Sequence, residues 1–222
     1  MSINRPYKST AELANSIAIF PLPGALLLPR GQMPLNIFES RYMSMIDDAL
    51  KVHRLIGMVQ PKDASNGGTH QFDIHNVGCV GRITQIAETG DGRYMLTLTG
   101  VARFRVAEEL SVMTPYRQCR VEYDEFVADL VDRAGEDVVD RKNVVEALRR
   151  FAEMRHLHVD WKEIEGTHTE MLVNALSMIS PFGVREKQAL LEAKDLKTRA
   201  EVLVAITEME LARAGTTPST LQ

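Results

Sequence analysis

The sequence has few of the residues on which several classes of protein depend. Its 222 residues include two cysteines, Cys79 and Cys119, so it carries no disulfide framework. Aromatic residues make up 6% of the chain, with a single tryptophan, which disfavours recognition of RNA by base stacking. The formal net charge is −4, whereas a duplex-binding domain is basic or carries a dense basic stripe. Nucleic acid is therefore a disfavoured partner.

Long apolar runs are also missing. The densest early run, Ala25–Leu28, lies between Gly24 and Pro29 and is far shorter than the ~20 residues that a membrane helix needs. The N-terminus has no apolar signal-peptide core. Both cysteines lie in apolar or strand-like runs, which predicts buried free thiols in a reducing compartment. We therefore expect a cytoplasmic protein that makes no membrane contact.

The first half of the chain has the pattern of short strands. Alternating residues over Val77–Glu88 and Arg93–Val106 flank Gly90-Asp91-Gly92, which is typical of a hairpin. Gly100, inside the second arm, predicts a bulge or sharp bend. Further short strands, punctuated by prolines, are expected at Ile17–Phe20, Leu26–Leu28, Leu55–Val59 and Tyr116–Tyr123.

Helical spacing dominates the second half. Apolar residues three and four apart predict helices over Glu39–Val52, from Val138 past Leu157, over Glu170–Ile179, over Val184–Ala193, and from Asp195 onward. The segment His168-Thr169-Glu170 is expected to begin a helix. Acidic residues crowd the stretch between strands and helices, which predicts a solvated connector.

These patterns predict an α+β protein, a small β-barrel followed by a C-terminal helical bundle. The expected organisation is a flexible tail over 1–15, a barrel over 16–124, an acidic connector over 125–137, a helical bundle over 138–214 and a second flexible tail over 215–222. Eleven methionines include Met43, Met45, Met171 and Met178 on expected helices. The first interpretation is that they fill irregular parts of the core, and the alternative is an adaptable binding surface.

Signatures of catalysis are weak throughout. The sequence has no phosphate-binding glycine loop and no Gly-x-Ser-x-Gly elbow. His156 and His158 are two residues apart on an expected helix, so they point to different faces and do not share a metal. Neither cysteine has a neighbouring histidine in the sequence. We therefore assign no catalytic residue, no metal ligand and no cofactor.

Several motifs, in consistent order over residues 16–212, resemble the N-terminal substrate-binding domain of Lon protease. The quoted segments are Phe20–Pro29 (FPLPGALLLP), Met33–Tyr42 (MPLNIFESRY), Ile56–Pro61, Val77–Ile83, Leu98–Val106, Arg185–Glu192 and Asp195–Arg199. The resemblance implies a PUA-like β-barrel beside a helical bundle. It further implies a non-catalytic module that recognises unfolded or exposed apolar protein segments, with an ATP-dependent protease as a candidate partner. The ATPase and peptidase parts of Lon have no counterpart in this sequence.

The same resemblance supplies candidate binding residues. Phe38, Glu39, Arg41 and Tyr42 match the family motif. Tyr42 lies on the apolar face of its expected helix, and Arg41 is placed to pair with Glu39 or with a carboxylate across the barrel. A structural role is the first interpretation of all four residues. A binding groove is expected between barrel and bundle, because pockets favour domain interfaces.

Two other functions remain open at this point. PUA domains suggest RNA binding by analogy of fold, which requires a basic face formed by arginines of the predicted strands. These arginines are Arg82, Arg93, Arg103, Arg105, Arg117 and Arg120. A hydrolase whose site carries no local motif is the third hypothesis.

Overall fold

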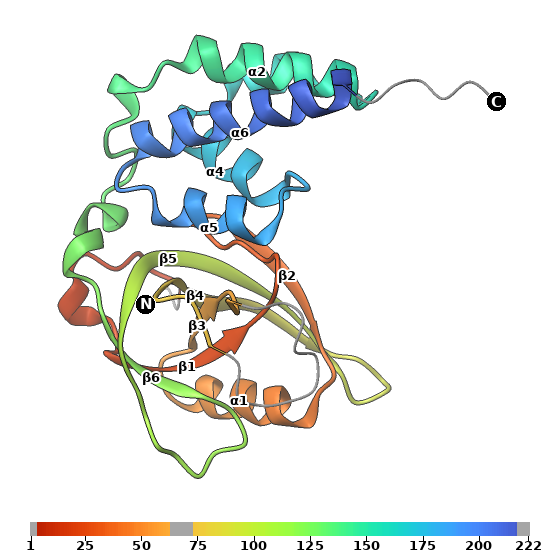
Figure 1. Ribbon diagram of the computed structural model, residues 1–222. Coiled ribbons are helices and arrows are strands. Elements are labelled where there is room, and N and C mark those ends of the chain that lie inside the picture. The colour runs from red at the N-terminus through yellow and green to blue at the C-terminus, as the bar shows by residue number, and fades with distance from the viewer. Residues whose placement is uncertain (1–3, 63–72, 217–222) are drawn as a thin grey trace.

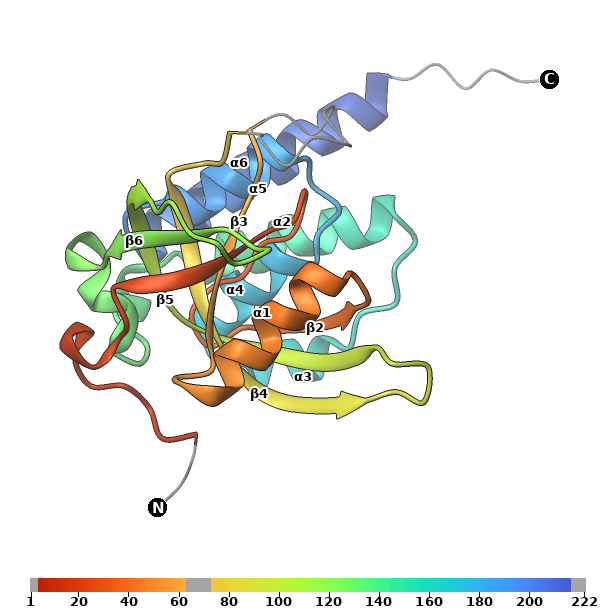
Figure 2. The ribbon, with the colours of Figure 1, turned by 90° about the horizontal axis from the view of Figure 1, so that it is seen from below.

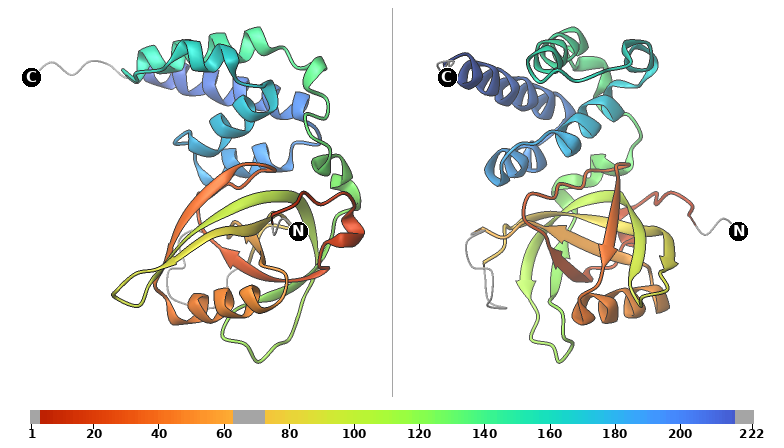
Figure 3. Two further views of the ribbon diagram at one scale, coloured as in Figure 1. Left: turned by 180° about the vertical axis from the view of Figure 1, so that it is seen from behind. Right: turned by 90° about the vertical axis from the view of Figure 1, so that its right-hand side faces the viewer.

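The computed structural model describes residues 4–62 and 73–216. Six strands and helix α1 form one half, and helices α2, α4, α5 and α6 stack on the other (Figure 1). Helix α1 lies on the side of the strands away from the other helices (Figure 3). The mixed α/β architecture predicted from the sequence is therefore confirmed. The predicted tails fall partly outside the described residues, at 1–3 and 217–222.

The strands form one sheet in the order β2-β5-β4-β3-β1-β6, and β5 also pairs with β6. The strand bounds are β1 (Ser16–Pro21), β2 (Gln32–Ile37), β3 (Leu55–Val59), β4 (Val77–Glu88), β5 (Tyr94–Glu109) and β6 (Gln118–Glu122). β1 and β3 are parallel, and the other pairs are antiparallel. The β5–β6 pairing brings the sheet back to β5, so five strands follow one another in a hydrogen-bonded ring with β2 attached at its side.

The predicted hairpin is the longest pairing in the sheet. β4 and β5 pair from Val77↔Arg105 to Glu88↔Tyr94, and the end of the hairpin projects from the body of the protein (Figure 2). A register shift follows Val80, which faces Ala102, because Gly81 faces Gly100. The bulge expected at Gly100 is therefore confirmed.

Gly100 also permits a close approach between two backbones. A Cβ at this position would overlap the carbonyl oxygen of Leu28, and Arg30 N–H donates to the Gly100 carbonyl at 2.8 Å. We expect Gly100→Ala to lower the free energy of unfolding by about 1–3 kcal/mol, as other overpacked sites do. Urea unfolding measures the change. Gly90→Ala is the control, because nothing lies within 4 Å of a Cβ there, and an equal loss in both variants would contradict the argument.

Two segments near the N-terminus differ from the sequence-based expectation. Leu26–Leu28 is buried, as its composition suggests, but it is a loop and not a strand. The Met33–Phe38 stretch supplies β2 instead, although Pro34 cannot donate a backbone hydrogen bond. Among the described strands β2 has one neighbour, β5, so Pro34 occupies an edge where a missing N–H is tolerated.

Helix bounds follow the sequence pattern closely at most positions. They are α1 (Ser40–Lys51), α2 (Arg141–Met154), α3 (Trp161–Gly166), α4 (Thr169–Ile179), α5 (Val184–Glu192) and α6 (Leu196–Thr216). The stripe expected to continue past Leu157 is interrupted, because α2 ends at Met154 and His156 adopts a positive φ of 53°. The short helix α3 had no counterpart in the sequence pattern.

Strands and helices share one buried cluster. Leu26, Leu27 and Leu28 join it from the N-terminal loop, and Leu98 joins it from β5. Helices α4, α5 and α6 contribute apolar side chains that include Leu172, Val173, Leu190 and Leu203. Burying these residues removes apolar surface from water on both sides of the contact. The helical half is therefore packed directly against the strands.

The acidic connector is not solvated along its whole length, which corrects the sequence-based expectation. It forms 3-10 turns at Asp124–Leu130 and Glu136–Val138. Phe126 is buried, and Asp129 is also buried because its carboxylate pairs with the buried guanidinium of Arg103 at 2.8 Å. A charge removed from water needs an opposite charge beside it. Asp129, one residue of the acidic run, is therefore buried as the ion-pair partner of Arg103.

Residues 4–15 belong to the segment for which the sequence predicts a flexible tail. Leu13 is buried, and the Tyr123 hydroxyl donates to the Ala14 carbonyl at 2.8 Å. Arg82 donates to the carbonyl oxygens of Arg5 and Asn4 at 2.7 and 3.0 Å.

Within residues 4–62 and 73–216, no helix has the length and apolar character needed to cross a membrane.

Candidate functional site

A groove of about 590 Å³ opens where the strands meet the helices. The loop Pro29–Gln32 forms one wall, helix α4 forms the second, and Asp132, Arg133 and His168 form the rim. We call this site the Met groove. Its volume lies in the range of natural ligand pockets. A groove at this junction is where the sequence-based argument expected one.

The α4 wall of the Met groove is apolar and open to solvent. Met171 and Ile179 are 63% and 75% exposed, and Ala175 and Met178 lie between them in the sequence. Met178 packs against Gly31, where any Cβ would overlap the thioether sulfur. Exposed methionines adapt their shape to varied apolar partners. The wall therefore offers a deformable apolar surface.

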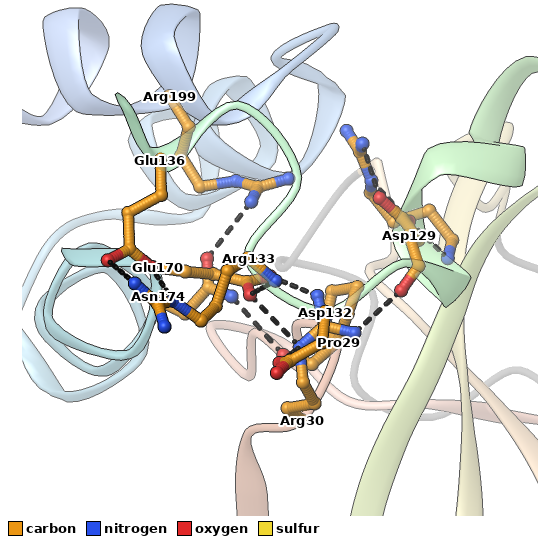
Figure 4. Close-up of polar contacts among 10 residues, drawn as sticks. Pro29, Arg30, Asp129, Asp132, Arg133, Glu136, Glu170, Asn174 and Arg199 are labelled. Carbon is orange, nitrogen blue, oxygen red and sulfur yellow. Dashed lines mark hydrogen bonds and ion pairs between the residues drawn. The ribbon is translucent and has the colours of Figure 1, made fainter. Parts of the chain in front are cut away.

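The opposite wall is polar, and its contacts converge on Glu170 (Figure 4). Arg30 Nε donates to Oε2 of Glu170 at 3.2 Å, and Arg30 Nη2 donates to Oε1. The backbone N–H of Arg133 donates to the same Oε2 at 2.8 Å. Arg30 Nη1 also donates to the Asp129 carbonyl at 2.7 Å. Glu170 lies in the first turn of α4, close to where the sequence predicts the helix to begin, and its carboxylate joins three segments of the chain.

A second polar contact fastens α4 to the same loop. Asn174 Nδ2 donates to the carbonyl oxygen of Pro29 at 3.2 Å. Arg199 Nη1 donates to Asn174 Oδ1 at 2.9 Å from α6 (Figure 4). Burial and the nearby charge of Arg103 lower the pKa of Arg199 to about 10, although Asp129 opposes the shift. The groove is therefore built on a rigid, buried polar network.

The rim of the Met groove carries an ionic contact of its own. Arg133 Nε and Nη2 donate to Glu136 at 3.1 and 3.2 Å, and His168 Nδ1 lies 3.8 Å from the same carboxylate. Burial raises the pKa of Glu136. The hydrogen bond from Arg133, those from backbone N–H groups and the charge of Arg133 together lower the pKa by more than burial raises it, so the pKa of Glu136 lies below the usual range. Glu136 is therefore an anion at neutral pH.

The four residues suggested by the family motif lie elsewhere, at the start of α1. Phe38 is 63% exposed, with the Arg93 guanidinium 5.9 Å from its ring centre. Glu39 pairs with Arg41 at 2.8 Å, as the sequence predicts. Tyr42 is buried and its ring centre lies 4.4 Å from that of Phe20. The structure therefore does not bring these residues to the Met groove.

Arg41 and Tyr42 line a second groove of about 630 Å³ beside the β5–β6 connection. Arg117 forms two hydrogen bonds with Glu109 in it, at 2.7 and 2.6 Å, and the Tyr116 hydroxyl donates to Asp48 at 2.9 Å. Burial and Asp48 raise the pKa of Tyr116 to about 12. In this groove Val112 is 40% exposed, whereas in the Met groove Met171 and Ile179 are 63% and 75% exposed, so the Met groove leaves more apolar surface in water.

The strand arginines do not form the free basic face that RNA binding requires. Arg103 is buried, and Arg82 is bound to backbone carbonyls of the N-terminal segment. The other arginines each have a carboxylate partner: Arg93 pairs with Asp91, Arg105 with Glu125, Arg117 with Glu109 and Arg120 with Glu108. Their charge is largely neutralised within the protein, which weighs against the RNA alternative.

Both cysteines are buried and free, as predicted. Burial raises the pKa of Cys119 to about 11, and it raises the pKa of Cys79 as well. The reactive form of cysteine is the thiolate. Both thiols are therefore protonated at neutral pH and are poor nucleophiles.

This arrangement is a mixed α/β fold, with a six-stranded sheet, a packed group of helices and a groove between them that has one apolar and one polar wall. The family model of the ATP-dependent protease La (LON) substrate-binding domain matches residues 16–208. The chain belongs to this family.

Curated relatives are Lon proteases, and they match in one part only. Lon protease 2 of Myxococcus xanthus is 27% identical over 197 residues, which cover 88% of this chain and 24% of the relative. The Lon protease of Flavobacterium johnsoniae is 28% identical over 207 residues, covering 91% of this chain and 25% of the relative. The chain thus spans about a quarter of the length of these proteins.

Solved structures show the same fold. A Lon N-terminal domain protein from Xanthomonas campestris superposes with a TM-score of 0.62 at 20% identity, covering 86% of this chain and 98% of that one. The N-terminal domain of the Mycobacterium avium complex Lon protease gives 0.59 at 16% identity, with coverages of 87% and 98%.

Proposed function

We propose that this chain is a non-catalytic recognition module that binds unfolded or exposed apolar segments of proteins in the Met groove. One observation carries the proposal: Met171 and Ile179 stand in water on the wall of an open groove, with 63% and 75% of their surface exposed. Large apolar groups exposed in a groove mark an interaction site. The substrate-binding description of the family supports the same conclusion.

The proposal includes the absence of catalysis in this module. The matches to Lon proteases are confined to their substrate-binding domain, and the two thiols are held protonated by burial. The ring of strand pairings supports the PUA-like barrel class. Two buried free thiols support a reducing compartment, so we place the protein in the cytoplasm. An ATP-dependent protease of the Lon type is the proposed partner that receives the bound segment.

Fluorescence anisotropy tests the binding function directly. The probe is a labelled synthetic peptide that alternates leucine with serine, and its control has glycine at every leucine. We expect the leucine peptide to bind at least about tenfold more tightly, because each buried leucine side chain contributes roughly 1.5–3 kcal/mol. Its affinity should change little with salt, since apolar burial and not ion pairing drives it.

The same titration with labelled single-stranded RNA as the probe tests the nucleic-acid alternative. Equal affinity for the two peptides would contradict the proposed function. Tighter binding of RNA, with an affinity that falls steeply as salt rises, would replace it with the nucleic-acid alternative, because phosphate contacts release counterions.

A further inference from the structure

The walls of the Met groove depend on one buried carboxylate. Glu170 is 8% exposed, and both of its oxygens accept hydrogen bonds from across the groove base. The donors are the Arg30 side chain, from the loop before β2, and the Arg133 backbone N–H, from the connector. Glu170 itself belongs to α4, the apolar wall. One side chain therefore ties together the three segments that surround the groove.

Two of these segments hold strained backbone. Among the described residues, four that are not glycine have positive φ, and two of them line the groove: Arg30 at 64° and Arg133 at 59°. A residue with a Cβ pays a conformational cost in this region, so neighbouring contacts must hold it there. Both strained residues donate hydrogen bonds to Glu170.

We propose that Glu170 is a positioning residue that sets the width of the Met groove by holding Arg30 and Arg133 in these strained conformations. The inference rests on the proposed function, because it assigns the residue that keeps that site in its binding-competent shape. Glu170 acts through the loop and the connector and does not itself provide the apolar contact. Without its charge, the backbone at Arg133 relaxes and the rim moves away from α4.

Glu170→Gln is the sharpest single change. Both carboxylate oxygens accept N–H groups, so either orientation of the amide places its NH₂ against a donor. We expect the Arg133 amide to exchange with solvent faster than in the wild-type chain, because its charged acceptor becomes either a neutral amide oxygen or an NH₂ group, depending on the orientation of the amide. We expect the leucine–serine peptide to bind roughly 3- to 30-fold more weakly, the range for residues that act on a site indirectly. Amide exchange and peptide affinity are both measured at a temperature well below the unfolding midpoint of each variant.

Asp137→Asn is the matched control for charge. Asp137 lies on the same connector, is exposed and does not line the Met groove. The variant removes one carboxylate charge from the connector and leaves the Glu170 contacts in place. Its Arg133 amide exchange and its peptide affinity are expected to match the wild-type values. Equal weakening in both variants would mean that net charge, and not positioning, controls binding.

Arg133→Gly provides the rescue test. Glu170 binds only the backbone N–H of Arg133, so glycine retains that contact, and glycine adopts positive φ without the usual cost. Added to Glu170→Gln, this change should bring the peptide affinity closer to the wild-type value than to that of Glu170→Gln alone. His156→Gly relieves a similar strain outside the groove, at a φ of 53°, and should rescue nothing.

Different results would contradict the proposed function and the positioning role of Glu170. If the wild-type chain does not prefer the leucine peptide, the proposed function is wrong, and amide exchange at Arg133 still decides whether Glu170 holds the connector. If the wild-type chain binds and Glu170→Gln changes neither amide exchange nor affinity, the positioning role is wrong. A loss of affinity that Arg133→Gly does not restore would also overturn it.

Discussion

A Met171→Asp variant is expected to bind the leucine–serine peptide at least about tenfold more weakly than the wild-type chain, since burying a methionine contributes roughly 1.5–3 kcal/mol. The added charge would have to be desolvated beneath an apolar partner, which increases the loss. Folding should tolerate the change, because Met171 is 63% exposed on α4. Anisotropy titration at a temperature well below the unfolding midpoint measures the effect.

Met209→Asp is the matched control for this prediction. Met209 is 53% exposed on α6 and does not line the Met groove. The two variants add the same charge to an exposed helical methionine, so only their position differs. Wild-type affinity is expected for Met209→Asp. Unchanged binding by Met171→Asp would remove the Met groove from consideration, and equal losses in both variants would indicate a general charge effect.

The sequence predicted the strands and helices whose own pattern of apolar and polar residues indicates their conformation. β4 runs over Val77–Glu88, the bounds that the alternating pattern predicts, and β3 likewise matches Leu55–Val59. The helix expected over Glu39–Val52 is observed over Ser40–Lys51. In these segments the period of the apolar residues reflects a face that meets the core. Gly100 belongs here too, because a glycine inside a strand signals a bulge.

Segments whose conformation depends on distant contacts were predicted poorly. Leu26–Leu28 has the composition of a buried strand, yet its neighbours are core side chains from the sheet and the helices, with no partner strand. The sequence pattern assigns no strand to β2. Pro34 disfavours a strand there, and the edge position of β2 makes this proline acceptable. Tertiary position overrides local preference at both sites.

The candidate site shows the same division. The sequence pattern assigns Met171 and Met178 first to the core, with an adaptable surface as the alternative, and the structure leaves Met171 63% exposed. The groove between the two halves was expected. The sequence did not predict a role for Arg30 in the groove, because its partner Glu170 lies 140 residues away in the sequence. An arginine between a proline and a glycine carries no local signal of such a pairing. The polar wall of the groove is therefore visible only in the folded chain.

Asp129→Ala is expected to lower the free energy of unfolding by about 3–5 kcal/mol, the cost of removing one partner of a buried ion pair. Arg103 and Asp129 are 3% and 7% exposed. Arg103 Nε and Nη2 donate to the two carboxylate oxygens at 2.9 and 2.8 Å, and the Arg103 backbone N–H donates to Oδ2 at 2.9 Å. Loss of the carboxylate leaves the buried Arg103 without its ion-pair partner and removes one of the negative charges that stabilise the buried Arg199.

Urea unfolding of Asp129→Ala measures this loss, and Glu125→Ala is its matched control. Glu125 pairs with Arg105, two residues along β5 from Arg103, but that pair is open to water on both sides, with 55% and 42% of the two side chains exposed. Water already solvates both charges there, so the unfolding midpoint should stay near the wild-type value. Similar midpoints for Asp129→Ala and the wild-type chain would show that the helices do not depend on the buried pair. A loss of stability in Asp129→Ala but not in Glu125→Ala would show that the buried ion pair stabilises the contact between the strands and the helices. Arg103 contributes to this contact directly, because its Nη1 also donates to the Leu191 carbonyl at the end of α5 at 3.1 Å.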